Sequence, residues 1–441
     1  MHLGSHGRSR SLGALAALGL VLAACGSSSP SSSSSSSGNG SPLLVGVVAP
    51  FTGADASLGP RYYAACVPAS LAINKAGGIM GHKVSCQQFD TRGEPADAVP
   101  AAQQMIASNS NLMAVVGCTS DEASSVVPII DHAHVPMFCM TGQSEFNKSS
   151  FTYFHRLVPP DEFDAYALVG SALDVNHYKR IALVFGNDIG SQAFVQPATN
   201  ALQNLGATVT INQALALGQS SYRTEVTAML ATHPDAIFTE ALGSTDATYL
   251  SEVKQLNGSS IPFMGTSATI DPVWFAAVTG AIGVPDVLKY FQAVDLGVSF
   301  SGPGYEDFLA NLTASAVQNA DAIKYKETGS TLHLYDGIMQ TALAMDATKS
   351  TDPTVYNPEI AKIGNGVSGA VVVNTYAAGV AALASGKSIK WVGAGGPTSY
   401  NQYNNSQQGY ILVKYDAQGN EVQYGALTEA QTAAVIAAGG G

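Results

Sequence analysis

Charged residues are scarce in this sequence, and basic residues are the scarcer kind. Asp, Glu, Lys and Arg make up 12% of the 441 residues, with 20 Lys plus Arg against 32 Asp plus Glu and a formal net charge of -12 at pH 7. A nucleic-acid partner requires a basic surface, so this balance argues against one. Sparse charge is typical of parallel sheets that are buried on both faces.

Sequence motifs of common catalytic and cofactor sites are also missing. The chain has no glycine-rich loop of the dinucleotide or P-loop kind and no Gly-x-Ser-x-Gly nucleophile turn. His132 and His134 are only two positions apart and do not share a helix face, which argues against a metal site. We therefore expect a protein that is not an enzyme and that has no cofactor.

The N-terminal residues follow the plan of a secretory signal. Basic residues precede an apolar stretch, residues 12–22, which is shorter than the ~20 residues of a membrane-spanning helix. Leu22-Ala23-Ala24-Cys25 matches the lipobox of bacterial lipoproteins, so we expect residues 1–24 to be removed and Cys25 to carry lipid. Residues 25–42, rich in Ser and Gly, are expected to form a flexible tether. This predicts a lipid-anchored protein on the extracytoplasmic side of the cell membrane.

Four further cysteines follow the tether: Cys66, Cys86, Cys118 and Cys139. An even number outside the cytoplasm suggests disulfides, and four cysteines allow three pairings. We favour Cys66 with Cys86 and Cys118 with Cys139, the second pair because its members fall near the ends of neighbouring predicted strands.

The body of the chain is too long for one hydrophobic core, which favours two domains. Strands and helices alternate in its first part, with strands at 43–48, 83–89 and 113–116 and helices at 62–74, 96–108 and 122–132. The alternation restarts after Pro159-Pro160, with strands at 180–185, 208–213 and 236–239 and helices at 161–173, 192–205 and 222–232. Helices near 332–347 and 367–384 and a β-rich end at 410–424 follow. Such βαβ repetition predicts an α/β fold with parallel, doubly wound sheets.

Several stretches resemble the type I periplasmic binding proteins of branched-chain amino-acid importers, the Leu/Ile/Val-binding family. They include Val47-Val48-Ala49-Pro50-Phe51-Thr52-Gly53, Gly77-Gly78-Ile79-Met80-Gly81, Phe263-Met264-Gly265 and Tyr335-Asp336-Gly337. The resemblance covers residues 43–424. It implies two Rossmann-like lobes with parallel sheets joined by three hinge crossovers, residues 43–160 with 290–390 and residues 161–289 with 391–441.

The same resemblance implies where a ligand binds. Ligands of open α/β sheets lie beyond the carboxyl ends of the strands, near helix N-termini. The family serine that grips a ligand carboxylate falls on Ser120, and the following loop falls on Thr141-Gly142-Gln143-Ser144. We expect ligand contacts from Ser120, Thr119, Thr141, Gln143 and Ser144. A purely structural alternative is that Ser120 and Thr141 cap helices.

The second lobe departs from the family pattern. The family's acid that pairs with a ligand ammonium group follows the Phe-Met-Gly strand, where this chain has Thr266-Ser267-Ala268. Family aromatics fall near Leu58, Ile189 and Leu242, which are aliphatic. We expect Ser267 to contact the ligand and Glu240, Asp188 or Asp246 to supply the replacement carboxylate.

The family resemblance implies a transport receptor. A monomer would capture an amino acid or a related small carboxylate or amide and deliver it to the permease and ATPase subunits of an ABC importer. One alternative is a sensing receptor that signals to a membrane partner, and another is a lipoprotein enzyme on the same scaffold.

Overall fold

The computed structural model describes residues 41–440, except residues 54 and 407. The expected signal segment, Cys25 and nearly all of the tether lie outside these residues. The described residues belong to one compact unit. None of the helices described is both long enough and apolar enough to cross a membrane.

The first sheet contains five parallel strands in the order β2-β1-β3-β4-β5. Their bounds are β1 Leu43–Ala49, β2 Val84–Asp90, β3 Leu112–Gly117, β4 Met137–Cys139 and β5 Phe154–Arg156. Residues of β1 alternate between two cores: Val45 and Val47 belong to one, and Leu44 and Val48 to the other. The sheet is therefore buried on both faces, as its apolar strands predict.

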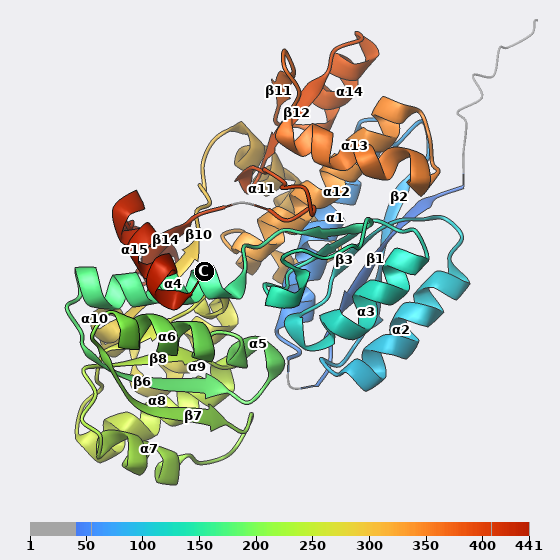
Figure 1. Cartoon of the computed structure of the whole chain (residues 1–441). Coiled ribbons are helices and arrows are strands. Elements are labelled where there is room, and N and C mark those ends of the chain that lie inside the picture. The colour runs from blue at the N-terminus through green and yellow to red at the C-terminus, as the bar shows by residue number, and fades with distance from the viewer. Residues whose placement is uncertain (1–40, 54, 407, 441) are drawn as a thin grey trace, which may run out of the picture. The chain divides into compact units, whose positions relative to one another are not determined.

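Helices cover both faces of this sheet (Figure 1). One face carries α2 Pro95–Ser108 and α3 Ser120–His132. The other carries α1 Leu58–Lys75, α11 Pro303–Ser315, η4 Ala320–Tyr325, α12 Gly329–Thr348, α13 Pro353–Asn365 and α14 Tyr376–Ala384. A short turn, η1 Ser144–Phe146, follows β4.

The second sheet has seven strands in the order β15-β14-β10-β9-β8-β6-β7. Their bounds are β6 Arg180–Gly186, β7 Thr208–Leu215, β8 Ala236–Glu240, β9 Phe263–Gly265, β10 Phe291–Leu296, β14 Tyr410–Tyr415 and β15 Glu421–Gly425. β14 is antiparallel to both of its neighbours, β10 and β15, and a turn in which Gly419 has a φ of +83° joins it to β15. The remaining pairs are parallel.

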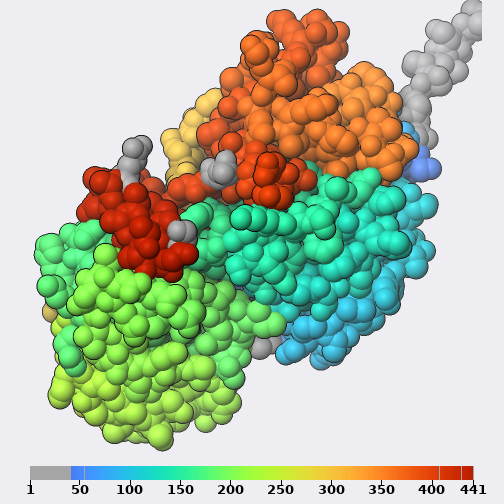
Figure 2. Space-filling model, in the orientation of Figure 1, coloured from blue at the N-terminus to red at the C-terminus, as the bar shows by residue number. Residues whose placement is uncertain are grey.

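Two helical layers also sandwich the second sheet. One layer includes α7 Arg223–Leu230, α8 Gly243–Asn257, α9 Pro272–Ile282 and α10 Val284–Tyr290. The other includes α4 Asp161–Gly170, its continuation η2 Ser171–Val175, α6 Val195–Asn204 and α15 Glu429–Gly439. The short α5 Ile189–Gln192 and η3 Ser267–Thr269 follow β6 and β9. In Figure 2 the C-terminal helix α15 (red) lies over the green residues of this lobe, where it packs on α4 and α6.

The predicted two-lobe α/β fold with three crossovers is confirmed, but two domain boundaries fall later than expected. β10 pairs with β9 and β14, so residues 291–296 belong to the second sheet and not to the first lobe. Trp391, Ala394 and Tyr400 lie in the core of the first lobe, and Asn405 donates to the backbone of η1. The chain therefore crosses between lobes after β5, after β10 and immediately before β14.

A small third sheet replaces part of an expected helix. Residues 367–384 were expected to be helical, but only α14 is, and it is preceded by β11 Val371–Val373. Gly366 and Gly369 have positive φ, which ends the helical path, and three consecutive valines favour a strand. β11 pairs with β12 Ile389–Gly393, which also pairs with β13 Gly396–Pro397.

Candidate functional site

The loop after β3 bends sharply before it enters α3. Gly117 has a φ of +109° and Cys118 a φ of +60°. The Cys118 N–H donates to the Val48 carbonyl of the neighbouring strand at 2.7 Å. These two left-handed residues turn the chain so that α3 begins at Ser120, beyond the carboxyl end of the sheet.

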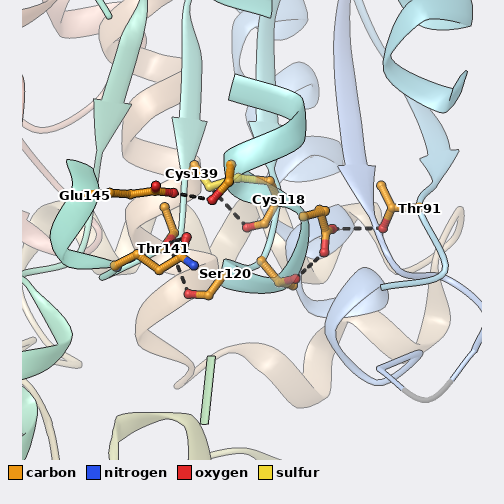
Figure 3. The surroundings of a disulfide bond; sticks show 10 residues. Thr91, Cys118, Ser120, Cys139, Thr141 and Glu145 are labelled. Atoms are coloured by element: carbon orange, nitrogen blue, oxygen red, sulfur yellow. Dashed lines mark hydrogen bonds between the residues drawn. A yellow bond between two sulfur atoms is a disulfide. The ribbon is translucent and has the colours of Figure 1, made fainter. Parts of the chain in front are cut away.

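A disulfide ties this loop to the loop after β4. Both pairings that we favoured from the sequence are present, Cys66 with Cys86 and Cys118 with Cys139. Ser120 follows Cys118 by two residues, and Thr141 follows Cys139 by two residues. Their hydroxyl oxygens lie 3.1 Å apart, and Figure 3 shows the two side chains pointing toward each other below the disulfide.

A cavity lies between the two lobes on this side of the sheets. Its inner part, the inner pocket, encloses about 670 Å³, part of it open to solvent. It is lined by Arg61, Ser120, Met140, Val158, Pro159, Asp161, Gly190, Phe194, Glu240, Ser267, Ala268, Ile270, Asp295, Leu296, Thr328, Gly329, Ser330 and Tyr410. Pro159, Leu296 and Tyr410 come from the three crossings, so the inner pocket adjoins all of them.

A second part, the outer pocket, adjoins the first and lacks residues of the crossings. It encloses about 780 Å³ and shares Arg61, Ser120 and Glu240 with the inner pocket. Leu58 and Leu242 line it, whereas Ile189 is half exposed. Trp274, which the sequence did not single out, supplies an aromatic wall. Both volumes include space that opens to solvent.

The predicted first-lobe residues divide into two groups. Ser120 lines both pockets, and Thr119 lines the outer one while its hydroxyl donates to Glu122. Thr141 is fully buried beneath Ser120 and also accepts a hydrogen bond from the Gln143 N–H. Gln143 and Ser144 line neither pocket. The Gln143 carbonyl accepts from Arg156 at 3.3 Å, and Ser144 begins η1, so the structure places both in the scaffold.

Three of the predicted second-lobe residues, Glu240, Ser267 and Asp188, lie at the cavity. Asp246 lines neither part of it and accepts hydrogen bonds from Thr239 and Trp274. Glu240, at the end of β8, lines both pockets and accepts a hydrogen bond from the Thr266 hydroxyl. Ser267 lines the inner pocket and donates to Asp164 at 2.6 Å. Asp188 lines the outer pocket and caps α5 by accepting from the Ser191 N–H at 2.7 Å.

Arg61 is the main residue that sequence reasoning missed. It lies in the first turn of α1, is 8% exposed, and its Nη1 lies 3.6 Å from Asp271 of the second lobe. Its Nε has no hydrogen-bond partner among the described residues. The helix was expected to begin at Tyr62. Pro60, which favours the first turn of a helix, was the signal that could have placed Arg61 inside it.

Carboxyl groups of both lobes meet at the outer pocket. Asp121 of α3 accepts hydrogen bonds from the Ile189 and Gly190 N–H groups of the second lobe, at 2.7 and 3.4 Å. Burial, together with the charge of Asp188, raises the pKa of Asp121 to about 6. The two lobes approach closely here, because a Cβ at Gly190 would lie 3.4 Å from the Ser120 Cβ, in ordinary van der Waals contact.

Asp55 makes stability depend on pH. Burial first, and then the charges of Asp121, Asp188 and other acids, raise its pKa to about 7 from an ordinary value of 3.8. The folded protein therefore holds more protons than the unfolded chain between pH of about 4 and about 7, and stability falls as pH rises through this window. We expect the melting temperature to be lower at pH 8 than at pH 5 and the difference to shrink in Asp55→Asn. The exposed Asp321 provides the control Asp321→Asn. A melting temperature that rises over this interval would contradict the assignment.

The fold and cavity together define a two-lobed binding protein for a small solute. The cavity lies between two α/β units, at the carboxyl ends of their strands, which is the usual position of a ligand in such folds. Within the described part of the chain, no group of three or more His, Cys, Asp or Glu side chains is arranged to hold a metal ion.

The chain belongs to the periplasmic binding protein family, whose model matches residues 42–420. An amino acid binding protein of Pseudomonas aeruginosa is 22% identical over 313 residues, 70% of this chain and 80% of that protein. Isoleucine-bound branched-chain amino acid substrate-binding protein of Streptococcus pneumoniae superposes with a TM-score of 0.69 at 16% identity, covering 88% of this chain and 99% of that one. A solute-binding protein of Rhodopseudomonas palustris in complex with p-hydroxybenzoic acid superposes with a TM-score of 0.65 at 18% identity, covering 88% of this chain and 98% of that one.

Proposed function

We propose that the protein is an extracytoplasmic solute-binding lipoprotein of an ABC importer. It captures a small polar ligand between its lobes and presents the closed form to permease subunits, which work with an ATPase. The observation that carries the proposal is a cavity that is lined by both lobes and adjoins all three crossings. A ligand that contacts both lobes favours their closure, since closure adds contacts that the open form lacks.

The proposal includes membrane attachment. Leu22-Ala23-Ala24-Cys25 supports lipid on Cys25, and residues 26–41 support a tether that lets a monomeric body stand off the membrane. Disulfides in the body are in keeping with an oxidising compartment.

The ligand classes in question are amino acids and small carboxylates. The relatives described above include an amino acid binding protein and a protein in complex with p-hydroxybenzoic acid. The pair of hydroxyls at Ser120 and Thr141 supports one polar end of the ligand lying against the first lobe.

Removal of the Ser120 hydroxyl tests the site. We expect Ser120→Ala to weaken binding roughly 10- to 100-fold, because a hydrogen bond to a charged group contributes about 1.5–3 kcal/mol. Binding is first detected by a thermal-shift screen of amino acids, small carboxylates and amides, since a ligand of the folded state raises the melting temperature. Isothermal titration then gives the two dissociation constants.

Ser124→Ala is the matched control for this experiment. Ser124 lies one turn further along α3, is exposed and bonds to Glu145 outside both pockets. Equal ligand affinities of the Ser120→Ala and Ser124→Ala proteins would show that the Ser120 hydroxyl does not bind the ligand. A screen with no stabilising compound would count against the proposed function itself.

A further inference from the structure

A third cavity, the hinge pocket, lies beside two of the crossings and apart from the other two pockets. It encloses about 940 Å³, part of it open to solvent, and its described lining residues fall within 147–163 and 401–409. Its walls therefore come from the first crossing, after β5, and the third, before β14. It shares one described lining residue, Pro159, with the inner pocket and none with the outer pocket. A ligand of the hinge pocket would bind away from Ser120.

Arg156 has a fixed place in the wall of this pocket. It is 1% exposed, and its Nη1 donates to the Gln143 carbonyl at 3.3 Å and to the Asn147 Oδ1 at 2.8 Å. The loop before β14 holds its backbone, since the Arg156 N–H donates to the Asn404 carbonyl and the Arg156 carbonyl accepts from the Ser406 N–H. The Nε of Arg156 is shielded from solvent and donates to none of the described residues. An oxygen atom of a ligand that accepted from this Nε would remove the cost of an unpaired buried donor.

The loop before β14 contributes unpaired oxygen atoms to the same pocket. Asn405 Oδ1, Ser406 Oγ and Gln408 Oε1 are shielded and bond to none of the described residues. The Asn405 Nδ2 donates to the carbonyls of Phe146 and Asn147 at 2.9 and 3.0 Å, which fixes the orientation of its amide. An anion cannot donate to the amide oxygens, and an ammonium group cannot accept from the arginine, whereas a hydroxyl group both donates and accepts. The unpaired atoms therefore match hydroxyl groups.

The formal charges of the hinge pocket cancel. Arg156 and Glu162 are the charged residues among its described lining residues. Asn147 joins them, because it accepts from Arg156 and donates to the Glu162 carboxylate at 2.6 Å. With one charge of each sign, the pocket gives neither an anion nor a cation a net Coulombic advantage. This balance favours a neutral ligand.

An aromatic ring adds an apolar surface to these polar groups. Phe163, in the first turn of α4, lines the hinge pocket and is 37% exposed. The face of an aromatic ring is negatively polarised, so it attracts the weakly positive C–H groups of a saturated ring. A ring that has C–H groups on one face and hydroxyl groups around its edge would use both kinds of surface.

We propose that the hinge pocket binds a neutral sugar unit. Its hydroxyl groups bond to the Arg156 Nε and to the amide oxygens of Asn405 and Gln408, and its C–H face lies on Phe163. A free monosaccharide and the end of a glycan share this chemistry. The site is additional to solute capture between the lobes and does not depend on it.

Sugars that differ in one charged group test the proposal. D-glucose, D-galactose and D-mannose are each compared with the matching uronate and the matching 2-amino sugar, at pH 6, where both are charged. Saturation-transfer NMR on the purified protein detects binding and shows which ring protons lie against it, and titration gives the dissociation constants. We expect at least one neutral sugar to bind, more tightly than its two charged counterparts and with saturation of one C–H face. An oligosaccharide that ends in the same sugar then distinguishes a glycan from a free sugar.

Two variants assign the binding to the hinge pocket. Phe163→Ala is expected to weaken the neutral sugar roughly 2- to 10-fold, since an aromatic contact contributes about 0.5–1.5 kcal/mol. Leu256→Ala is its control, because Leu256 is 39% exposed on α8 and lies outside the hinge pocket. Glu162→Gln leaves Arg156 as the one formal charge of the described lining, so it is expected to strengthen uronate binding relative to the neutral sugar.

The outcomes separate this inference from the proposed function. Neutral sugars that all fail to bind, or that bind equally well to the Phe163→Ala protein, would overturn the sugar site and leave solute capture in place. Charged sugars that bind as tightly as the neutral ones would also overturn it. Sugar binding that is lost in Ser120→Ala but kept in Phe163→Ala would place the sugar between the lobes, and so would overturn the hinge pocket as its site while supporting solute capture.

Discussion

Replacement of both Cys118 and Cys139 by alanine is expected to lower the free energy of unfolding by about 3 kcal/mol and to weaken ligand binding. The stability loss follows from the loop that the disulfide closes, whose ends are 21 residues apart in sequence. The binding loss follows from position, because Ser120 and Thr141 each lie two residues beyond a bridged cysteine. Urea denaturation measures the first effect and calorimetric titration the second.

The other disulfide is a control of nearly equal loop length. Cys66 and Cys86 are 20 residues apart and join α1 to β2, so their double alanine variant should lose similar stability. It should keep its ligand affinity, since neither cysteine lies in the loops that carry the two hydroxyls. Equal affinity of both double variants and the unmodified protein would show that the Cys118–Cys139 bridge does not position the site.

The Gly117→Ala variant is expected to be destabilised by about 3 kcal/mol or more. A Cβ at Gly117 would lie 2.3 Å from the Val48 carbonyl oxygen, and its φ of +109° is strained for any residue with a side chain. Val48 belongs to the central strand β1, so the backbone cannot move aside without disturbing the sheet. The free energy of unfolding in urea measures the effect.

Gly206→Ala separates the two causes of this expected loss. Gly206 has a φ of +80°, but its Cβ would meet nothing within 4 Å. We expect a cost of about 1 kcal/mol there, from backbone conformation alone. A Gly117→Ala protein as stable as Gly206→Ala would mean that the loop after β3 relaxes easily, and would weaken the case for a rigidly positioned Ser120.

The sequence predicted those features that depend on local pattern. The turn Gly77-Gly78-Ile79-Met80-Gly81 has positive φ at each glycine and at Met80, as a tight reversal between helix and strand requires. Cys118 and Cys139 were paired correctly because parallel strands end at one edge of a sheet. The family resemblance placed Ser120 and Thr141 at one ligand site, and their hydroxyl groups are in contact.

Features that depend on contact between distant residues were not predicted. Arg61 and Asp271 are 210 positions apart, and nothing in the residues around either one indicates the other. The approach of Asp121 to the backbone of α5 depends in the same way on how the lobes meet. The boundary at β10 was misplaced because strand order in a sheet is set by packing, and a strand's own residues do not specify its neighbours.

The place of the inner pocket beside Pro159, Leu296 and Tyr410 has a mechanical consequence. The three crossings form the hinge between the lobes, so a ligand in the inner pocket lies close to the axis about which the lobes would rotate. A ligand that is slightly too wide for the inner pocket would separate the edges of the lobes far from the crossings, here called the rims, by more than the excess width itself. In the proposed importer, ligand size would thereby set the distance between the two rims, and a membrane partner that contacts both rims would reject an ill-fitting solute without contacting it.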